Sequence, residues 1–177
     1  MKPAARLNEF GQSAWLDLIG RKLIRSGELK RMIEEDGVRG VTANPAIFEK
    51  AIVESDEYDD ELTKLIEQGK SPMEIYETIA IEDVQAACDV FRPLFDRLQG
   101  RDGFVSLEVS PYIAGDTRAT VAEAKRFWKV VDRPNVMIKI PANPEGIPAI
   151  REAIAAGISV NITLIFSQRQ YHAAREA

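Results

Sequence analysis

Four segments with the composition of buried β-strands each carry polar or charged side chains near their carboxyl ends. These side chains are Asp17 in WLDLI, Glu108 in VSLEV, Lys139 in VMIKI, and the pair Asn161 and Thr163 in SVNITL. Strands of a parallel sheet are usually covered on both faces and read as apolar runs, so each such side chain is costly to bury alone. Catalytic side chains of parallel α/β folds gather at the carboxyl ends of the strands. The repeated pattern therefore predicts one shared site.

Lys139 has the most specific chemistry of the five residues. Its neighbours Ile138 and Ile140 indicate an apolar setting, which disfavours the ammonium form and leaves free amine to attack a carbonyl group. A nearby carboxylate would instead favour the ammonium form of the lysine. An attacking amine also needs acid–base groups that move protons and expel water. Asp17 and Glu108 are the acidic residues that we expect inside strands, and they fit this role.

Two simpler explanations apply to the same residues. Each polar side chain, taken alone, is consistent with the frayed end of a strand, because charged residues are almost never fully buried unless they are paired. Asp17 and Lys139 would also fit a buried ion pair. The recurrence of the pattern in several strands favours a shared site over either explanation.

Short β-rich segments alternate with longer helical ones, which indicates repeated βα units and a parallel sheet. The five expected strands are residues 13–19, 38–42, 104–109, 136–140 and 159–164. One helix is expected to cross between the first two strands, in residues 21–37. A helical insertion at about 45–100 follows the second strand.

Several local signals place the remaining helices. Ser71-Pro72-Met73-Glu74 predicts a helix that opens with a capping box, and Thr120-Val121-Ala122-Glu123 predicts a second one after the third strand. Further helices are expected at about 146–156 and from about Ser167. Cys88 shares helical spacing with apolar neighbours, so we expect a small core residue rather than a reactive thiol.

Composition excludes several classes of protein. The chain has 177 residues, 45% of them apolar, and a single cysteine, which does not fit a disordered chain or a disulfide framework. The longest apolar stretch, 157–166, is far shorter than the roughly 18 residues that span a bilayer, and the amino terminus lacks the core of a signal peptide. The net charge of -5, without a basic block, argues against nucleic-acid or membrane-surface partners. We therefore expect a cytoplasmic protein.

Three motifs, taken in order, resemble the transaldolase family of the class I aldolase superfamily. They are GVTANPAIF at 40–48, VMIKIP at 136–141 followed by Gly146, and GISVNITLIFS at 157–167. The amino-terminal part further resembles the transaldolase type that is sometimes fused to glucose-6-phosphate isomerase. The resemblance implies an α/β fold, the (β/α)8 TIM barrel. Since such a barrel needs about 200–250 residues, we expect residues 1–177 to form one incomplete barrel domain with the first five βα units.

The resemblance also implies a reaction for these positions. A dihydroxyacetone unit would move from fructose 6-phosphate or sedoheptulose 7-phosphate to an aldose phosphate through a Schiff base, as in the pentose phosphate pathway. Lys139 would attack the C2 carbonyl of the ketose phosphate, and Glu108 would move protons through a water held by Thr163. Asp17 would take the proton of the C4 hydroxyl. The implied substrate-binding residues are Asn44, Asn161 and Thr42.

The resemblance implies neither a metal nor an organic cofactor, because the iminium group itself is the electron sink. Glu108 favours transaldolases over the related fructose-6-phosphate aldolases, which have Gln at that place. The phosphate-binding Ser and Arg residues of the family lie on later strands, beyond Ala177. Arg169, Arg175 and His172 are expected to be solvated or structural.

Two alternatives belong to other classes of protein. The chain would be catalytically inactive if it were a fragment, or one half of a split barrel that needs a partner chain. Open strand edges would then favour a homo-oligomer or pairing with the missing carboxyl-terminal part. A flavodoxin-like binding module also has five parallel strands, but it does not explain a lysine inside a strand, and the chain has no Gly-rich phosphate loop.

Overall fold

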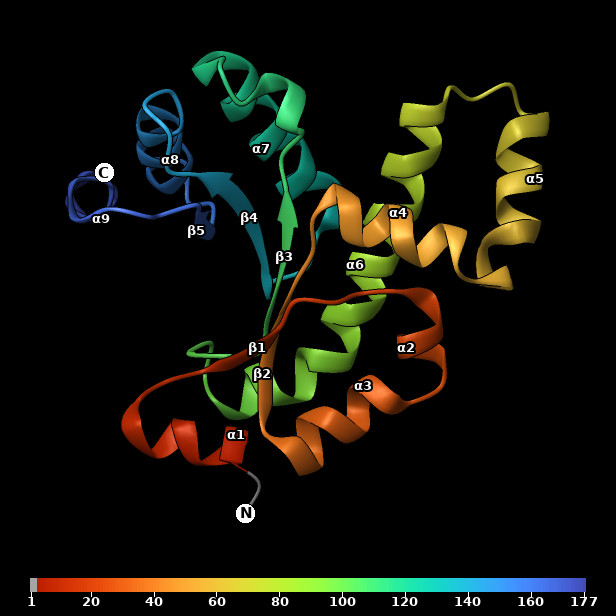
Figure 1. The fold of residues 1–177 in the computed structure, drawn as a ribbon, viewed down its shortest axis with the longest axis horizontal. Helices are drawn as coiled ribbons and strands as arrows, with labels where there is room; N and C mark the ends of the chain where they lie inside the picture. Colours follow the sequence, from red (N-terminus) through yellow and green to blue (C-terminus); the bar gives the residue numbers. More distant parts are fainter. Residues whose placement is uncertain (1–2) are drawn as a thin grey trace. The chain divides into compact units, whose positions relative to one another are not determined.

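The structure is a computed structural model that describes residues 3–177, in which helices alternate with five strands (Figure 1). The strands are β1 (Ala14–Leu16), β2 (Val38–Thr42), β3 (Phe104–Glu108), β4 (Val136–Pro141) and β5 (Val160–Thr163). They follow one another in the sheet in the order β1-β2-β3-β4-β5. Because successive strands are neighbours, as in a (β/α)8 barrel, the expected α/β class with five βα units is confirmed.

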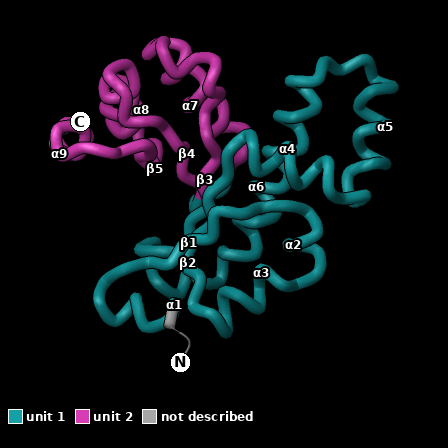
Figure 2. Tube along the Cα trace, viewed as in Figure 1, with its two compact units in different colours: residues 1–105, 133–135 teal, residues 106–132, 136–177 magenta. Residues whose placement is uncertain are grey.

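The chain consists of two compact units, which Figure 2 shows in different colours. Unit 1 runs to Val105 and includes Arg133–Asn135, and unit 2 contains Ser106–Asp132 and Val136–Ala177. The boundary between the units therefore falls inside β3. The expectation of one domain over residues 1–177 stays a prediction.

Unit 1 contains β1, β2 and the insertion expected at about 45–100. Its helical segments are α1 (Pro3–Arg6), η1 (Leu7–Phe10), α2 (Arg21–Arg25), α3 (Glu28–Arg31), η2 (Met32–Asp36), α4 (Pro45–Val53), η3 (Asp56–Tyr58), α5 (Asp59–Glu67) and α6 (Pro72–Arg97). The single helix expected in residues 21–37 is wrong. The chain breaks at Ser26 and Gly27 into α2 and α3, and the π-helical turn η2 completes the crossing to β2.

The capping box expected before α6 is confirmed. The N–H of Ser71 donates to Glu74 Oε2 at 2.8 Å, and the N–H of Glu74 donates to Ser71 Oγ at 3.4 Å. On the same helix Cys88 is fully buried, and this burial, together with the charge of Asp89, raises the pKa of the thiol to about 12. The thiol is therefore protonated at neutral pH, as expected of a core residue.

The pairing of β1 with β2 depends on a glycine. The two strands are parallel, and Trp15 lies opposite Gly40. A Cβ atom at residue 40 would lie 2.4 Å from Cε2 of Trp15. The indole ring therefore packs directly on the backbone of β2, which requires glycine at this position.

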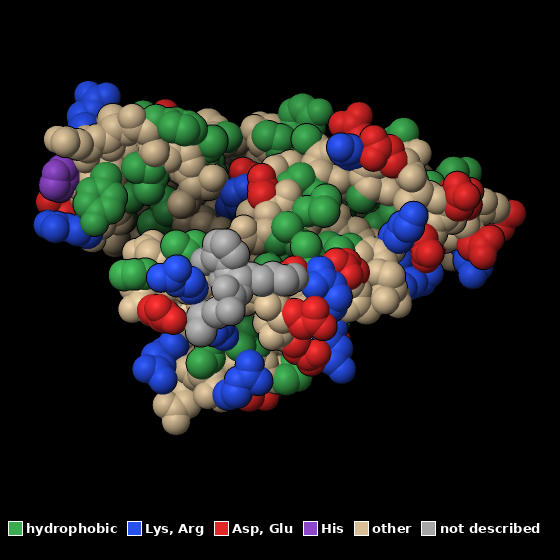
Figure 3. All heavy atoms as spheres, turned by 60° about the horizontal axis from the view of Figure 1, so that its bottom comes forward, with side chains coloured by type: hydrophobic (Ala, Val, Ile, Leu, Met, Phe, Trp, Pro, Cys, Tyr) green, Lys and Arg blue, Asp and Glu red, His purple; other side chains and the backbone are tan. Residues whose placement is uncertain are grey.

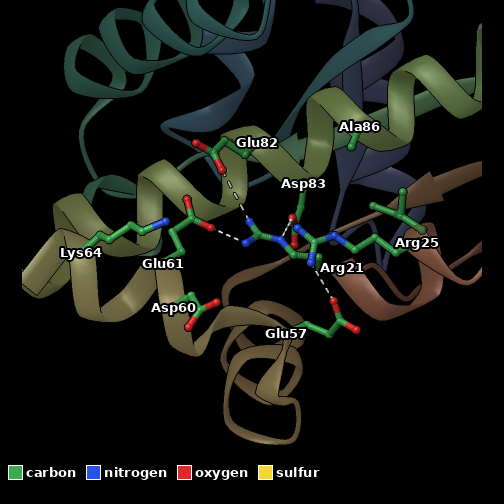
Figure 4. A pocket seen from close by; sticks show the side chains of 10 residues that line it. Arg21, Arg25, Glu57, Asp60, Glu61, Lys64, Glu82, Asp83 and Ala86 are labelled. Atoms are coloured by element: carbon green, nitrogen blue, oxygen red, sulfur yellow. Dashed lines mark hydrogen bonds and ion pairs between the residues drawn. The ribbon is translucent and has the colours of Figure 1, made fainter.

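A buried arginine connects α2 to the helices of the insertion. Figure 4 shows the guanidinium of Arg21 facing carboxylates from α5 and α6. It contacts Glu61, lies 3.1 Å from Oδ1 of Asp83 and 3.5 Å from Oε2 of Glu82, and borders a cavity of about 530 Å³. The hydroxyl of Tyr58 donates to Asp83 Oδ2 at 2.6 Å and accepts from the N–H of Arg21 at 2.7 Å. One cation is thus shared by three carboxylates, which favours protonation of one of them.

Unit 2 contains β4, β5 and most of β3. Its helical segments are η4 (Pro111–Ile113), α7 (Thr117–Val131), α8 (Gly146–Ala155) and α9 (Gln168–Glu176). The capping box expected at residues 120–123 is wrong, because the N-cap of α7 is Asp116, four residues before Thr120. Oδ1 of Asp116 accepts from the N–H of Ala119 at 3.0 Å. Thr120 lies inside the helix and donates to the carbonyl of Ile113 at 3.2 Å, while Glu123 accepts from the N–H of Ser110.

The surface shows mixed charge. Basic and acidic side chains are interspersed on the face shown in Figure 3. Among the described residues, none of the helices is both long enough and apolar enough to cross a membrane. The expected absence of nucleic-acid and membrane partners stays a prediction.

We predict that Glu82→Gln stabilises the protein at alkaline pH. Burial, the hydrogen bond with Glu61 and the charge of Glu61 raise the pKa of Glu82 to about 7 from 4.5. The folded chain thus holds a proton that the unfolded chain releases, so this group lowers stability progressively from about pH 4.5 to about pH 7, and fully above that. Glutamine removes this penalty.

The measurement is the thermal midpoint of the complete protein from pH 4.5 to 8.5. Glu82→Gln should raise the midpoint above pH 7 and flatten its decline between pH 4.5 and 7. Glu67→Gln, which removes an exposed carboxylate from α5, is the matched control. A lower midpoint at pH 8 for Glu82→Gln would show that Glu82 stabilises Arg21 as an anion.

Candidate active site

Lys139 and Glu108 form an ion pair on neighbouring strands of unit 2. Nζ of Lys139 lies 3.2 Å from Oε2 of Glu108, and only 10% and 18% of the two side chains are exposed. Ile138 and Ile140 on either side of the lysine are fully buried. The N–H of Val109 donates to the carbonyl of Lys139 at 3.1 Å, which aligns β3 with β4 beside the pair. A buried charge is tolerated when it is paired, so Glu108 accounts for a lysine inside an apolar strand.

The strand β5 places two more of the predicted residues beside this pair. β4 and β5 are parallel, with Lys139 opposite Asn161 and Pro141 opposite Thr163. Neighbouring strands lie about 4.8 Å apart, and residues two apart on a strand point to the same face. The structure therefore places Lys139, Glu108, Asn161 and Thr163 on three consecutive strands of unit 2. That they act as one site stays a prediction.

Ser106 is a member of this cluster that sequence reasoning missed. It is fully buried and precedes Glu108 by two residues on β3, so the two side chains share a face. Nδ2 of Asn161 donates to Oγ of Ser106 at 3.0 Å. The available signal was this spacing of two in FVSLEV, which places a hydroxyl beside the carboxylate.

The chain turns sharply after β5. Leu164 follows Thr163 directly, has a φ of 60° and is 52% exposed. This left-handed conformation costs a residue with a Cβ atom about 1–2 kcal/mol. Gln170 on α9 supports the turn, because its Nε2 donates to the carbonyls of Ala142 and Leu164, each at 3.4 Å. The end of β5 is therefore held in a strained conformation beside the cluster.

The other predicted site residues, Asp17, Thr42 and Asn44, lie in unit 1. Asp17 is exposed and directly follows β1, so its expected place inside a strand is wrong; β1 ends at Leu16, where its pairing with β2 stops. Thr42 ends β2, and its Oγ1 is buried without a hydrogen-bond partner among residues 3–177. Asn44 is the N-cap of α4, and its Oδ1 accepts from the N–H of Ile47 at 3.0 Å. That these three join Lys139 stays a prediction.

Comparison with known proteins identifies the family of the chain. Residues 14–177 match the family described as transaldolase/fructose-6-phosphate aldolase. The chain belongs to this family. It is 50% identical to a transaldolase of Thermobifida fusca over 175 residues, which are 99% of this chain and 48% of the relative. It is 48% identical to a transaldolase of Trichodesmium erythraeum over 165 residues, 93% of this chain and 43% of the relative.

A protein named transaldolase 2 from Streptomyces coelicolor is 49% identical over 172 residues, 97% of this chain and 46% of the relative. The chain thus spans about half the length of the curated relatives it matches. The expected membership of the transaldolase family is confirmed.

Asn143 connects β4 to α8. Its Oδ1 accepts from the N–H of Gly146 at 2.9 Å, and its Nδ2 donates to the carbonyl of Ala114 at 2.6 Å. An amide has its donor and its acceptor on separate atoms, so one side chain makes both bonds. A Cβ atom at Gly146 would lie 1.9 Å from the carbonyl oxygen of Pro141, which leaves room only for glycine.

We predict that Gly146→Ala destabilises the complete protein by about 1–3 kcal/mol, because the methyl group must displace backbone at the end of β4. The measurement is the urea midpoint of unfolding. Gly115→Ala is the matched control from the same unit, since a Cβ atom there meets nothing within 4 Å. Equal midpoints for the two variants would contradict the close approach of Gly146 to Pro141.

Proposed function

We propose that this chain carries the Schiff-base residues of a transaldolase, which transfers a dihydroxyacetone unit from a ketose phosphate to an aldose phosphate. The observation that carries the proposal is the Lys139–Glu108 pair, with nitrogen and oxygen 3.2 Å apart on a largely buried face. A carboxylate at this distance accepts a proton from the ammonium and releases the free amine. The family match and the relatives named transaldolase support the same reaction.

The first half of the reaction forms the Schiff base. The amine of Lys139 attacks the C2 carbonyl of the ketose phosphate and gives a carbinolamine. Glu108 passes a proton to the C2 hydroxyl through a water that Thr163 holds, and this hydroxyl leaves as water. The lone pair of nitrogen then forms the C=N bond of the iminium ion.

The second half breaks a carbon–carbon bond. Asp17 takes the proton of the C4 hydroxyl, the C3–C4 electron pair moves toward the iminium, and an aldose phosphate leaves. The enamine of dihydroxyacetone remains on Lys139 and attacks the aldehyde of the acceptor, while Asp17 returns its proton. Hydrolysis of the new iminium frees the product and the lysine.

Amide and hydroxyl side chains orient the substrate in this proposal. Asn161 and Asn44 hydrogen-bond the hydroxyl groups and the enamine nitrogen, and Thr42 lines the rim. Asn44 does so through Nδ2, because its Oδ1 already caps α4. Fructose 6-phosphate and sedoheptulose 7-phosphate are the proposed donors, as in the pentose phosphate pathway.

We predict that borohydride reduction with fructose 6-phosphate traps a covalent adduct on Lys139 of the complete protein. Reduction converts the iminium into a stable secondary amine, which peptide mass spectrometry locates. Lys139→Arg should abolish trapping, because a guanidinium does not form the Schiff base. Lys129→Arg, an exposed position on α7, should trap as the wild type does. An adduct on another residue would refute the assignment.

We predict that Glu108→Gln lowers kcat for transaldolase turnover by about 10²–10⁴, the usual contribution of a positioned acid–base group. The amide keeps the shape of the side chain but no longer accepts the proton from Lys139. Glu152→Gln, an exposed position on α8, serves as the control and should leave kcat unchanged. Full activity of Glu108→Gln would remove Glu108 from the mechanism.

The alternative proposal is a chain that is inactive by itself and needs a partner chain. It is favoured by the coverage of only 43–48% of the relatives' length. Turnover and solution mass of residues 1–177 alone decide between the two proposals. An active monomer excludes the alternative, and activity that appears only in an oligomer or with an added chain supports it.

A further inference from the structure

A hydrogen bond in unit 2 crosses over the strand that bears Lys139. Asn161 lies on β5 and Ser106 on β3, and β4 lies between these strands in the sheet. Strands two positions apart are about 10 Å from one another in a flat sheet. The 3.0 Å bond between Nδ2 of Asn161 and Oγ of Ser106 therefore requires that this face of the three strands be concave.

In the structure this bond orients the Asn161 amide with Nδ2 toward Ser106. A carboxamide has a donor end at Nδ2 and an acceptor end at Oδ1. Since Ser106 occupies the donor end, the acceptor end is left for another donor. Asn161 is opposite Lys139 in the register of β4 and β5, so the two side chains lie on the same face of the sheet.

We infer that Ser106 is a positioning residue that holds the Asn161 amide with its oxygen available to the Schiff-base nitrogen. The inference rests on the proposed function, because it concerns the nitrogen once it has reacted. An iminium or enamine N–H is a donor and needs an acceptor, which Oδ1 supplies. The hydroxyl of Ser106 does not touch the substrate and acts only through Asn161.

Loss of the hydroxyl has a specific consequence. Without an acceptor at residue 106, the amide of Asn161 is free to rotate and to present its NH₂ group toward the nitrogen of Lys139. Two donors then face each other, and the positively charged iminium loses stabilisation. The ground-state contacts of the substrate's remote groups are unaffected, so the defect belongs in kcat rather than in KM.

The test compares Ser106→Ala and Ser106→Cys in the complete protein. We expect both variants to lower kcat roughly 10- to 100-fold, as misplacement of a supporting group does, with KM within about twofold. A thiol fills the space of the hydroxyl but is a weak acceptor, so Cys restores packing without restoring the hydrogen bond. Full recovery of kcat in Ser106→Cys would show that Ser106 only fills space, and would overturn the inference.

A double variant provides the second measurement. If Ser106 acts through Asn161, then kcat of Ser106→Ala combined with Asn161→Ala equals that of Asn161→Ala alone. Additive losses would overturn the inference. The NMR signals of the Asn161 side-chain amide provide a third measurement, which is independent of turnover: they should shift in Ser106→Ala, and unchanged signals would refute the bond. If Ser106→Ala does not fold, the kinetic and NMR measurements are made on Ser106→Cys instead.

Borohydride trapping separates this inference from the function on which it rests. If the wild type forms no adduct on Lys139, the proposed function fails and the role of Ser106 fails with it. If the wild type forms the adduct and both Ser106 variants turn over at the wild-type rate, only the inference fails.

Discussion

The ion pair between Lys139 and Glu108 is the constraint on which the arrangement of unit 2 depends. A largely buried ammonium group on an apolar strand is costly unless a carboxylate lies within reach, and the neighbouring strand supplies one. The pair therefore requires the alignment of β3 with β4 that the bond from Val109 to the carbonyl of Lys139 fixes. In the proposed function stability and reactivity would have the same origin, because Glu108, which neutralises the lysine, would also accept its proton.

Hydrogen bonds of two asparagine side chains hold the strands of unit 2 around this pair. The bond between Asn161 and Ser106 draws β5 toward β3 over the lysine, and Asn143 holds the turn that follows β4. These contacts come from amide groups, which serve as donor and acceptor at once. The concave face is thus maintained by polar side chains as well as by the backbone hydrogen bonds of the sheet.

Much of the fold and part of the site could be predicted from the sequence, and the failures have physical reasons. Lys139 and Glu108 stood out because charges inside apolar strands need an explanation. Ser106 did not, because a small hydroxyl is common in strands and its role depends on a residue 55 positions away. Thr120 and Glu123 have the spacing of a capping box, but Asp116 is the N-cap of α7, so both residues lie inside the helix. That Asp17, Thr42 and Asn44 of unit 1 belong to the same site as Lys139 stays a prediction.

The left-handed conformation of Leu164 is one that another residue would adopt at lower cost. A glycine at this position would adopt the same backbone without the steric cost, so the leucine forgoes stability that was readily available. Strained backbone conformations are common next to functional residues, where the position of a side chain matters more than stability. A half-exposed leucine directly after β5 thus marks a position where protein engineering can recover stability.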